Sequence, residues 1–227
     1  MDEHLPPVIA IDGPSASGKG TVAQQVAQRL GFHYLDSGVL YRALALAALR
    51  SGIDHADETA LARLAEDLPI RVVEDNVYLN QELVTKDIRS EEVSATASTI
   101  AALPAVRLAL LASQRALRQP PGLVADGRDI GSTVFPDAVL KIYLTADVAE
   151  RARRRHKQLI GKGLNANMAT LLQDIRARDE RDSARAVAPL HKSNDASLLD
   201  TTALTIAAAV EQVLARYAAA IATKWVP

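Results

Sequence analysis

The chain of 227 residues contains no cysteine, no long apolar run and no excess of positive charge. Without cysteine it can form neither disulfides nor thiolate metal sites. No segment reaches the roughly 18 consecutive apolar residues that indicate a membrane-spanning helix. The acidic, proline-containing N-terminus is unlike a secretory signal. We therefore expect a cytoplasmic protein without a membrane partner.

Positive and negative charges are nearly balanced, with 26 Lys and Arg against 27 Asp and Glu. A general nucleic-acid binder usually carries a large positive excess, so we expect no nucleic-acid partner. Phosphate groups could still be bound by local clusters of basic residues, and two clusters occur at 151–157 and 176–185. By their pattern alone, both are better explained as solvated helix faces with ion pairs three or four residues apart. The five histidines show no spacing typical of a metal site.

Short apolar runs alternate with helical patterns along most of the chain. Strands are predicted at 8–11, 32–35, 123–125, 139–144 and 198–199, and helices at 19–30, 40–49, 106–117, 148–159, 168–181 and 204–217. This alternation predicts an α/β fold with a central parallel sheet. Residues 70–85 differ, because short β-rich pieces surround polar turns there, which indicates a small antiparallel meander. We expect residues 37–102 to form an insert on the α/β core.

Residues 13–21 read GPSASGKGT and match a phosphate-binding loop of the Walker A type. Glycines let successive backbone N–H groups point at phosphate oxygens, and the following helix directs its positive end at the same anion. Lys19 would reach the β and γ phosphates, and Thr21 would offer a hydroxyl to Mg²⁺. The predicted strand before the motif and helix after it distinguish it from a simple Gly-rich turn. The predicted ATP site comprises Gly13, Pro14, Ser15, Ala16, Ser17, Gly18, Lys19, Gly20 and Thr21.

A loop of this kind binds nucleoside triphosphates without identifying the reaction. Guanine-binding switch proteins need an Asn-Lys-x-Asp motif, which the sequence lacks. Motor and transport ATPases are usually longer or contain several domains. A chain of this length with an inserted lobe is more typical of a small-molecule kinase that uses ATP.

A second group of polar residues, Asp126, Arg128 and Asp129, follows the predicted strand at 123–125. Ligands bind at the carboxyl ends of the strands in open parallel sheets. Asp126 could therefore hold Mg²⁺ directly or through water, while Arg128 faces a phosphate and Asp129 a base or sugar. Arg42 lies in an otherwise apolar helix and needs a partner. The spacing does not decide whether that partner is a structural carboxylate or a phosphate.

Four segments, GPSASGKGT, LDSGVLYR, VADGRDIG and RDERDSARAVAP, resemble in order and spacing the bacterial cytidylate kinases, a family of nucleoside monophosphate kinases. The resemblance extends over nearly the whole chain. It implies an α/β fold of the P-loop NTPase type: a three-layer sandwich with a five-stranded parallel sheet, a small antiparallel β insert and a short lid. A single kinase domain would cover 1–227, with its core at 7–36 and 103–220, the monophosphate-binding insert at 37–102 and the lid at about 151–167. We expect a monomer.

The resemblance also implies roles for individual residues. The catalytic residues would be Lys19, Arg128, Arg154, Arg178 and Arg185, and Mg²⁺ would meet Thr21 and Asp126. The acceptor, CMP or dCMP, would be bound by Ser37, Tyr41, Arg42, Ser98, Arg107, Arg128, Asp129, Arg178, Asp182 and Arg185. Within this set, Arg42, Arg128 and Arg185 would hold the phosphate, Ser98, Arg107 and Asp129 the cytosine, and Arg178 and Asp182 the ribose.

Two other hypotheses remain open on the sequence. The first is a P-loop kinase with another acceptor, such as UMP, AMP or shikimate. The second is a regulatory module that binds a nucleotide and transfers nothing.

Overall fold

The computed structural model describes residues 5–73, 76–161, 163, 165–185 and 187–224. The chain divides into two compact units, one formed by Met1–Leu35 with Leu117–Pro227 and the other by Asp36–Ala116. We call them the sheet unit and the helical unit. Positions 74–75 of the predicted meander and positions 162 and 164 of the predicted lid lie outside the described ranges.

The sheet unit contains five strands in the order β2-β6-β1-β7-β8. β1 pairs in parallel with β6 and with β7, and β7 pairs in parallel with β8. The strands are β1 (Val8–Asp12), β2 (His33–Asp36), β6 (Leu123–Gly127), β7 (Leu140–Thr145) and β8 (Ser197–Asp200). The predicted α/β fold with five parallel strands and helices on both sides is confirmed.

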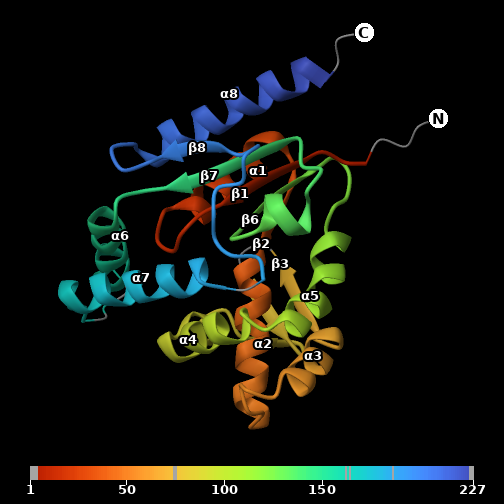
Figure 1. Cartoon of the computed structure of the whole chain (residues 1–227), viewed down its shortest axis with the longest axis vertical. Coiled ribbons are helices and arrows are strands. Elements are labelled where there is room, and N and C mark those ends of the chain that lie inside the picture. The colour runs from red at the N-terminus through yellow and green to blue at the C-terminus, as the bar shows by residue number, and fades with distance from the viewer. Residues whose placement is uncertain (1–4, 74–75, 162, 164, 186, 225–227) are drawn as a thin grey trace. The chain divides into compact units, whose positions relative to one another are not determined.

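Helices α1 and α8 pack on each other and on the sheet. Figure 1 shows α8, in dark blue, running along β7. Their apolar faces and the strands form one core cluster, in which Ile11, Val26 and Val213 are almost completely buried. The helical elements of this unit are α1 (Lys19–Leu30), η2 (Ile130–Val134), α6 (Val148–Ile160), α7 (Met168–Ser183) and α8 (Ile206–Lys224).

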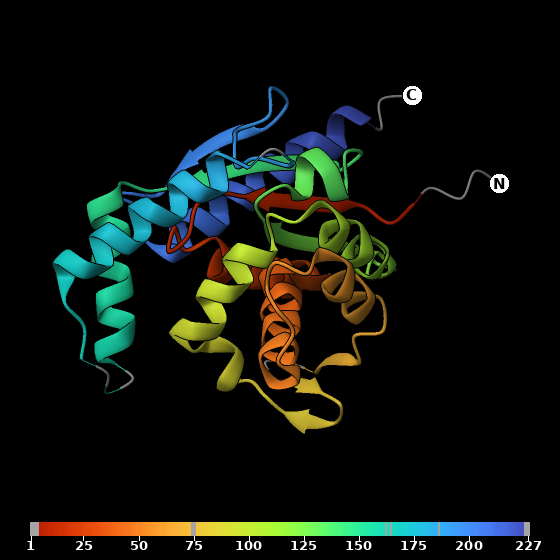
Figure 2. The ribbon, with the colours of Figure 1, turned by 60° about the horizontal axis from the view of Figure 1, so that its bottom comes forward.

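The helical unit packs α2 against α4 and α3 against α5. Its helical elements are α2 (Ser37–Ser51), α3 (Glu58–Glu66), η1 (Asp87–Arg89), α4 (Glu91–Ile100) and α5 (Pro104–Ala116). A separate antiparallel sheet has the order β3-β4-β5 and comprises β3 (Ile70–Val73), β4 (Asn76–Leu79) and β5 (Glu82–Leu83). The predicted meander is thus present. Figure 2 shows it in yellow at the C-terminal end of α2, where Arg50 donates to Glu82 at 2.7 and 3.0 Å.

Several element boundaries differ from those predicted, and the start of α2 is one that bears on the site. α2 begins at Ser37, directly after β2, whereas the apolar pattern predicted a helix only from residue 40. Gly38 permits this early start, because a Cβ there would lie 2.9 Å from Arg42 Nη1 and 3.0 Å from Asp36 Oδ1. The compact helical unit also includes α5, and the monophosphate-binding insert at 37–102 stays a prediction. A hydrogen bond of 2.6 Å from the Ala105 N–H to Glu58 Oε1 joins α5 to α3.

Within the described residues, no single helix is long and apolar enough to cross a membrane. The pair α4 and α5 passes the same test of length and composition only as two halves that meet at an angle of 102°.

The core packing of the helical unit generates a stability prediction. Leu44 in α2 is fully buried, whereas Leu108 in α5 is 71% exposed. We expect Leu44→Ala to lower the free energy of unfolding by about 2–5 kcal/mol, because it removes buried methyl groups and leaves a cavity. Leu108→Ala, the matched control, should change it by less than about 0.5 kcal/mol. Urea denaturation measures both, and equal effects of the two substitutions would contradict the packing described here.

Candidate active site

The predicted phosphate loop connects β1 to α1 in the sheet unit. Gly13 has φ of 156°, and a Cβ there would meet the carbonyl oxygen of Leu144 at 1.9 Å. Gly18 has φ of 90° and caps the N-terminus of α1. Ala16 has φ of 57°, which costs a non-glycine residue about 1–2 kcal/mol. The loop therefore has the bent backbone that an anion-binding loop before a helix requires.

The side chain of Asp126, at the end of β6, lies beside the first turn of α1. The Asp126 carboxylate is buried, with Lys19 Nζ at 3.9 Å from Oδ2. Tyr34 from β2 donates its hydroxyl to Oδ1 at 2.7 Å. A Cβ on Gly20 would lie 3.4 Å from the Tyr34 hydroxyl. Asp126 is thus held between a lysine and a phenol, close to where a phosphate would lie.

A magnesium ion fits this arrangement. Among the described residues there is no group of three or more His, Cys, Asp or Glu side chains that could hold a metal by itself. Mg²⁺ is usually bound by one or two carboxylates together with water and substrate phosphates. The Asp126 carboxylate and the exposed Thr21 hydroxyl in the first turn of α1 offer this kind of incomplete set.

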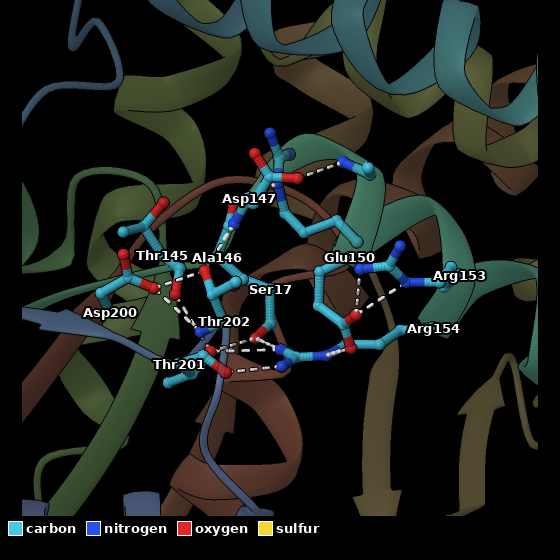
Figure 3. Close-up of polar contacts among 12 residues, drawn as sticks. Ser17, Thr145, Ala146, Asp147, Glu150, Arg153, Arg154, Asp200, Thr201 and Thr202 are labelled. Atoms are coloured by element: carbon cyan, nitrogen blue, oxygen red, sulfur yellow. Dashed lines mark hydrogen bonds and ion pairs between the residues drawn. The ribbon is translucent and has the colours of Figure 1, made fainter.

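Arg154, from α6, contacts the main chain of the phosphate loop. Figure 3 shows its guanidinium between Ser17 and Thr201, with Glu150 on the other side. Nη1 donates to the Ser17 carbonyl at 2.9 Å, Nη2 to the Thr201 carbonyl at 2.6 Å, and Nε to Glu150 at 3.1 Å. The buried Thr201 hydroxyl also lies 3.3 Å from the Ser17 carbonyl. Arg154 therefore joins the loop to the segment after β8.

Arg151, one turn earlier in α6, makes a similar connection to the start of the loop. Its guanidinium binds Asp179 of α7 with two hydrogen bonds, of 3.1 and 2.6 Å. It also donates to the Ser15 carbonyl at 3.1 Å. Because Arg151 is only 4% exposed, its charge is matched inside the protein. α6, whose residues from 151 onward belong to the predicted lid, and α7, which follows that lid, are thereby tied to the phosphate loop.

Two of the predicted catalytic arginines converge on the carboxylate of Asp182. Arg128 Nε donates to Oδ2 at 2.8 Å, and Arg185 donates to Oδ1. Burial alone would raise the pKa of Asp182, but the charges of Arg128 and Arg185 outweigh burial and hold this pKa below its usual value. The charge of Arg178 acts in the same direction. Three arginine charges thus act on one carboxylate, and arginines are side chains that bind phosphate well.

Asp129 is buried and precedes the short turn η2. The backbone of this turn is bound by Asp12, whose carboxylate accepts the N–H groups of Ile130 and Gly131, each at 2.8 Å. Asp12 pairs with Gly127 in the register of β1 and β6. The segment that contains Arg128 and Asp129 is therefore held at both ends.

The remaining predicted residues lie in the helical unit. Arg42 forms an ion pair of 2.8 Å with Asp36, so its protein partner is a carboxylate. Arg107 lies over the ring of Tyr41, 5.9 Å from its centroid, and donates to the Ala101 carbonyl at 3.1 Å. The buried Ser98 hydroxyl has no hydrogen-bond partner among the described residues. Ser37 is buried in the first turn of α2.

Several residues of this site escaped the sequence analysis. Tyr34, Asp12 and Thr201 act on the predicted residues through contacts between distant segments, such as the 92 positions that separate Tyr34 from Asp126. Asp12 had a usable signal, because a carboxylate at the end of a buried strand directly before a phosphate loop is costly unless it is hydrogen-bonded. Thr201 follows a predicted strand but has no comparable signal.

Comparisons with known proteins give a consistent result. The family model described as "Cytidylate kinase" matches residues 9–219. A protein named cytidylate kinase from Chromobacterium violaceum is 63% identical over 92% of this chain and 94% of its own length. A namesake from Nitrosomonas europaea is 53% identical over 97% of this chain and 99% of its own length. Among solved structures, an uncharacterized protein from Eubacterium ventriosum is 11% identical with a TM-score of 0.54, covering 93% of this chain and 98% of that chain, a likeness of fold alone.

The backbone of the phosphate loop generates a prediction for ATP binding. Gly13→Ala should abolish it, because the added Cβ would overlap the Leu144 carbonyl. Gly31→Ala is the matched control, since Gly31 also has a positive φ, of 65°, but a Cβ there would meet nothing within 4 Å. We expect the control to lose about 1 kcal/mol of stability and to retain ATP affinity. Calorimetric titration with ATP measures both, and normal affinity of Gly13→Ala would contradict the loop geometry.

Proposed function

This chain belongs to the cytidylate kinase family, and from that premise we propose that it transfers the γ-phosphoryl group of ATP to CMP or dCMP, giving ADP and CDP or dCDP. The observation that carries the proposal is the register of β1 and β6, in which Asp12 pairs with Gly127. The phosphate loop starts directly after Asp12, and Arg128 directly follows Gly127. A donor and an acceptor phosphate bound by these two segments would be neighbours, as direct transfer requires.

The positive charges of the sheet unit support this chemistry. Phosphoryl transfer needs alignment and neutralisation of charge, with little covalent work by the protein. Lys19 would face the β and γ phosphates, while Arg128 and Arg185 would hold the acceptor phosphate. An arginine that meets the transferred group can contribute about 10³-fold or more to the rate. Mg²⁺ bound with ATP would neutralise further phosphate charge, and Thr21 and Asp126 are the residues that would hold it.

Arg178 and Arg154 have separate proposed roles. The charge of Arg178 acts on Asp182, and we propose that both residues meet the ribose of the acceptor. The contacts of Arg154 with Ser17 and Thr201 favour a role on the ATP side, in holding the phosphate loop. Lid closure over the nucleotides would exclude water and suppress ATP hydrolysis.

The choice of base is proposed to depend on Asp129. A carboxylate can accept a hydrogen bond from the cytosine 4-amino group, as acidic side chains do with cytosine in DNA. Uracil presents an oxygen at this position and would repel the carboxylate. One good contact of this kind discriminates by about 1–3 kcal/mol.

The helical unit is proposed to complete acceptor recognition. The Ser98 hydroxyl, buried without a partner among the described residues, is available to a ligand atom. Arg107, held over Tyr41, would face the base. Arg42 would contact the acceptor phosphate, with Asp36 orienting its guanidinium, and Ser37 and Tyr41 would line the acceptor site. These roles follow the resemblance residue by residue.

The proposed partners are ATP and CMP or dCMP, with no nucleic acid and no membrane. The net charge of −1 supports the first exclusion. A monomer in the cytoplasm is the corresponding proposal for assembly and location, and size-exclusion chromatography with light scattering tests the assembly.

A coupled assay of ADP release tests the proposed function. The full-length protein is given CMP, dCMP, UMP and AMP in parallel, with Mg²⁺ and ATP. We expect the highest kcat/KM with CMP or dCMP, and no turnover for Lys19→Ala, because the lysine is the loop's charge for the β and γ phosphates. Equal or better rates with AMP would reject the cytidylate assignment. Tight ATP binding without transfer to any monophosphate would favour a regulatory module.

The base-reading role of Asp129 predicts a change in selectivity. Asp129→Ala should narrow the ratio of kcat/KM between CMP and UMP by about 5–150-fold, which corresponds to the loss of about 1–3 kcal/mol of discrimination. Asp137→Ala is the matched control, since this exposed carboxylate pairs with Arg118 at the surface of the sheet unit. An unchanged ratio in Asp129→Ala would count against base reading.

A further inference from the structure

Asp12 occupies the position between the two phosphate-binding segments of the sheet unit. It is the last residue of β1, and Gly13 of the phosphate loop follows it directly. Its two carboxylate oxygens accept separate hydrogen bonds, from the N–H of Ile130 and the N–H of Gly131, both at 2.8 Å. Arg128 and Asp129 immediately precede these two residues. One side chain thus connects the start of the phosphate loop to the end of the proposed acceptor-binding segment.

The two N–H groups that Asp12 binds need these bonds. They open the short turn η2, and the first N–H groups of any helical turn have no partner within the turn. Ile130 is fully buried and Gly131 is buried, so water does not replace a missing acceptor. The turn also lies tightly on the sheet, because a Cβ on Gly131 would be 3.1 Å from Lys141 Cγ. Removing one acceptor oxygen would therefore leave a buried donor unsatisfied and release this backbone.

We propose that Asp12 is a positioning residue, whose carboxylate fixes the backbone of 130–131 and thereby holds Arg128 and Asp129 in place for the monophosphate acceptor. The inference rests on the proposed function and goes beyond it, because Asp12 itself touches neither nucleotide. It acts on the acceptor side through main-chain N–H groups, while the phosphate loop keeps its own contacts with Arg151 and Arg154.

The protonation of Asp12 offers a way to test this role. Burial raises the pKa of Asp12 from 3.8 to about 6, although the two N–H bonds and Arg128 oppose the change and Asp129 adds to it. The paired residue on β6 is Gly127, which has no charge, and the paired residue on β7 is Tyr143. Burial raises the pKa of Tyr143 above its usual 10, so this phenol stays neutral. The Lys141 ammonium, on the strand below Gly131, is paired with Asp195.

The direction of the effect follows from these values. Because the pKa in the folded protein, about 6, lies above the ordinary 3.8, ionisation of Asp12 disfavours the folded state as the pH rises through this interval. Below pH 6 the protonated carboxyl loses one acceptor oxygen. Acid should therefore weaken the hydrogen bonds from the N–H groups of Ile130 and Gly131 to Asp12, as Asp12→Asn does.

Steady-state kinetics of the full-length protein with Asp12→Asn test the proposal. We expect KM for CMP to rise about tenfold at pH 7.5, which is the equivalent of one hydrogen bond to a charged group. KM for ATP should stay within about twofold of wild type, because the phosphate loop is held by its own hydrogen bonds from Arg151 and Arg154. The acceptor phosphate itself titrates near pH 6, so wild type and variant must be compared at each pH. The tenfold difference in KM for CMP between Asp12→Asn and wild type should disappear as the pH falls to 5. Asp137→Asn, which alters an exposed surface pair, is the matched control and should behave as wild type.

Each outcome is decisive. Three results for Asp12→Asn would each overturn the role of Asp12. These are a KM for CMP within twofold of wild type, a rise in KM for ATP that parallels the rise for CMP, or a difference in KM for CMP from wild type that does not change with pH. Wild-type protein without activity on CMP would instead reject the proposed function. Should Asp12→Asn fail to fold, the amide proton signals of Ile130 and Gly131 in wild-type protein provide the test. They should titrate together with a midpoint near pH 6, and constant signals between pH 4.5 and 7.5 would overturn the inference.

Discussion

The parallel register of β1 and β6 is the constraint on which the rest of the sheet unit depends. It pairs Asp12 with Gly127, so that the phosphate loop and the segment with Arg128 and Asp129 leave the same edge at adjacent positions. Both strands are buried on both faces, and a slip of one residue would exchange the side chains that face the two layers of helices. The distance between the two segments is therefore determined by core packing.

Carboxylates organise the cationic groups of the site. Asp182 gathers Arg128 and Arg185, Asp179 binds Arg151, and Asp126 lies between Lys19 and Tyr34. A cluster of free cations would repel and lose rotamer order, whereas each carboxylate fixes a guanidinium before any nucleotide arrives. Such preorganisation suits phosphoryl transfer, whose catalysis is mainly alignment and charge neutralisation. Asp12 fixes main-chain N–H groups in the same way, because its carboxylate accepts hydrogen bonds from Ile130 and Gly131.

The sequence predicted most of the helices and strands, but it predicted their first and last residues less well. The helix at 19–30 was placed correctly, because a glycine in the left-handed conformation follows it and apolar residues recur at intervals of four. The start of α2 was missed, since Ser37 and Gly38 are typical of a loop, and the ion pair between Asp36 and Arg42 that spans this first turn is seen only in the structure. The short helix α3 was also missed, although Asp57 caps it through the N–H of Ala60.

The sequence by itself determined the phosphate loop and the parallel α/β sheet, because each depends on local residue patterns: glycine spacing, apolar periodicity and strand–helix alternation. The kinase class was indicated by the resemblance of four segments to the cytidylate kinases. Only the tertiary structure decided which acid each arginine meets, that Arg154 contacts the Ser17 carbonyl, and that Asp12 binds the turn at 130–131. These partners lie more than a hundred positions apart in the last two cases. Sequence patterns do not report how close two residues lie in space when they are so far apart in the chain. Only the packing of the sheet brings these groups within hydrogen-bond range.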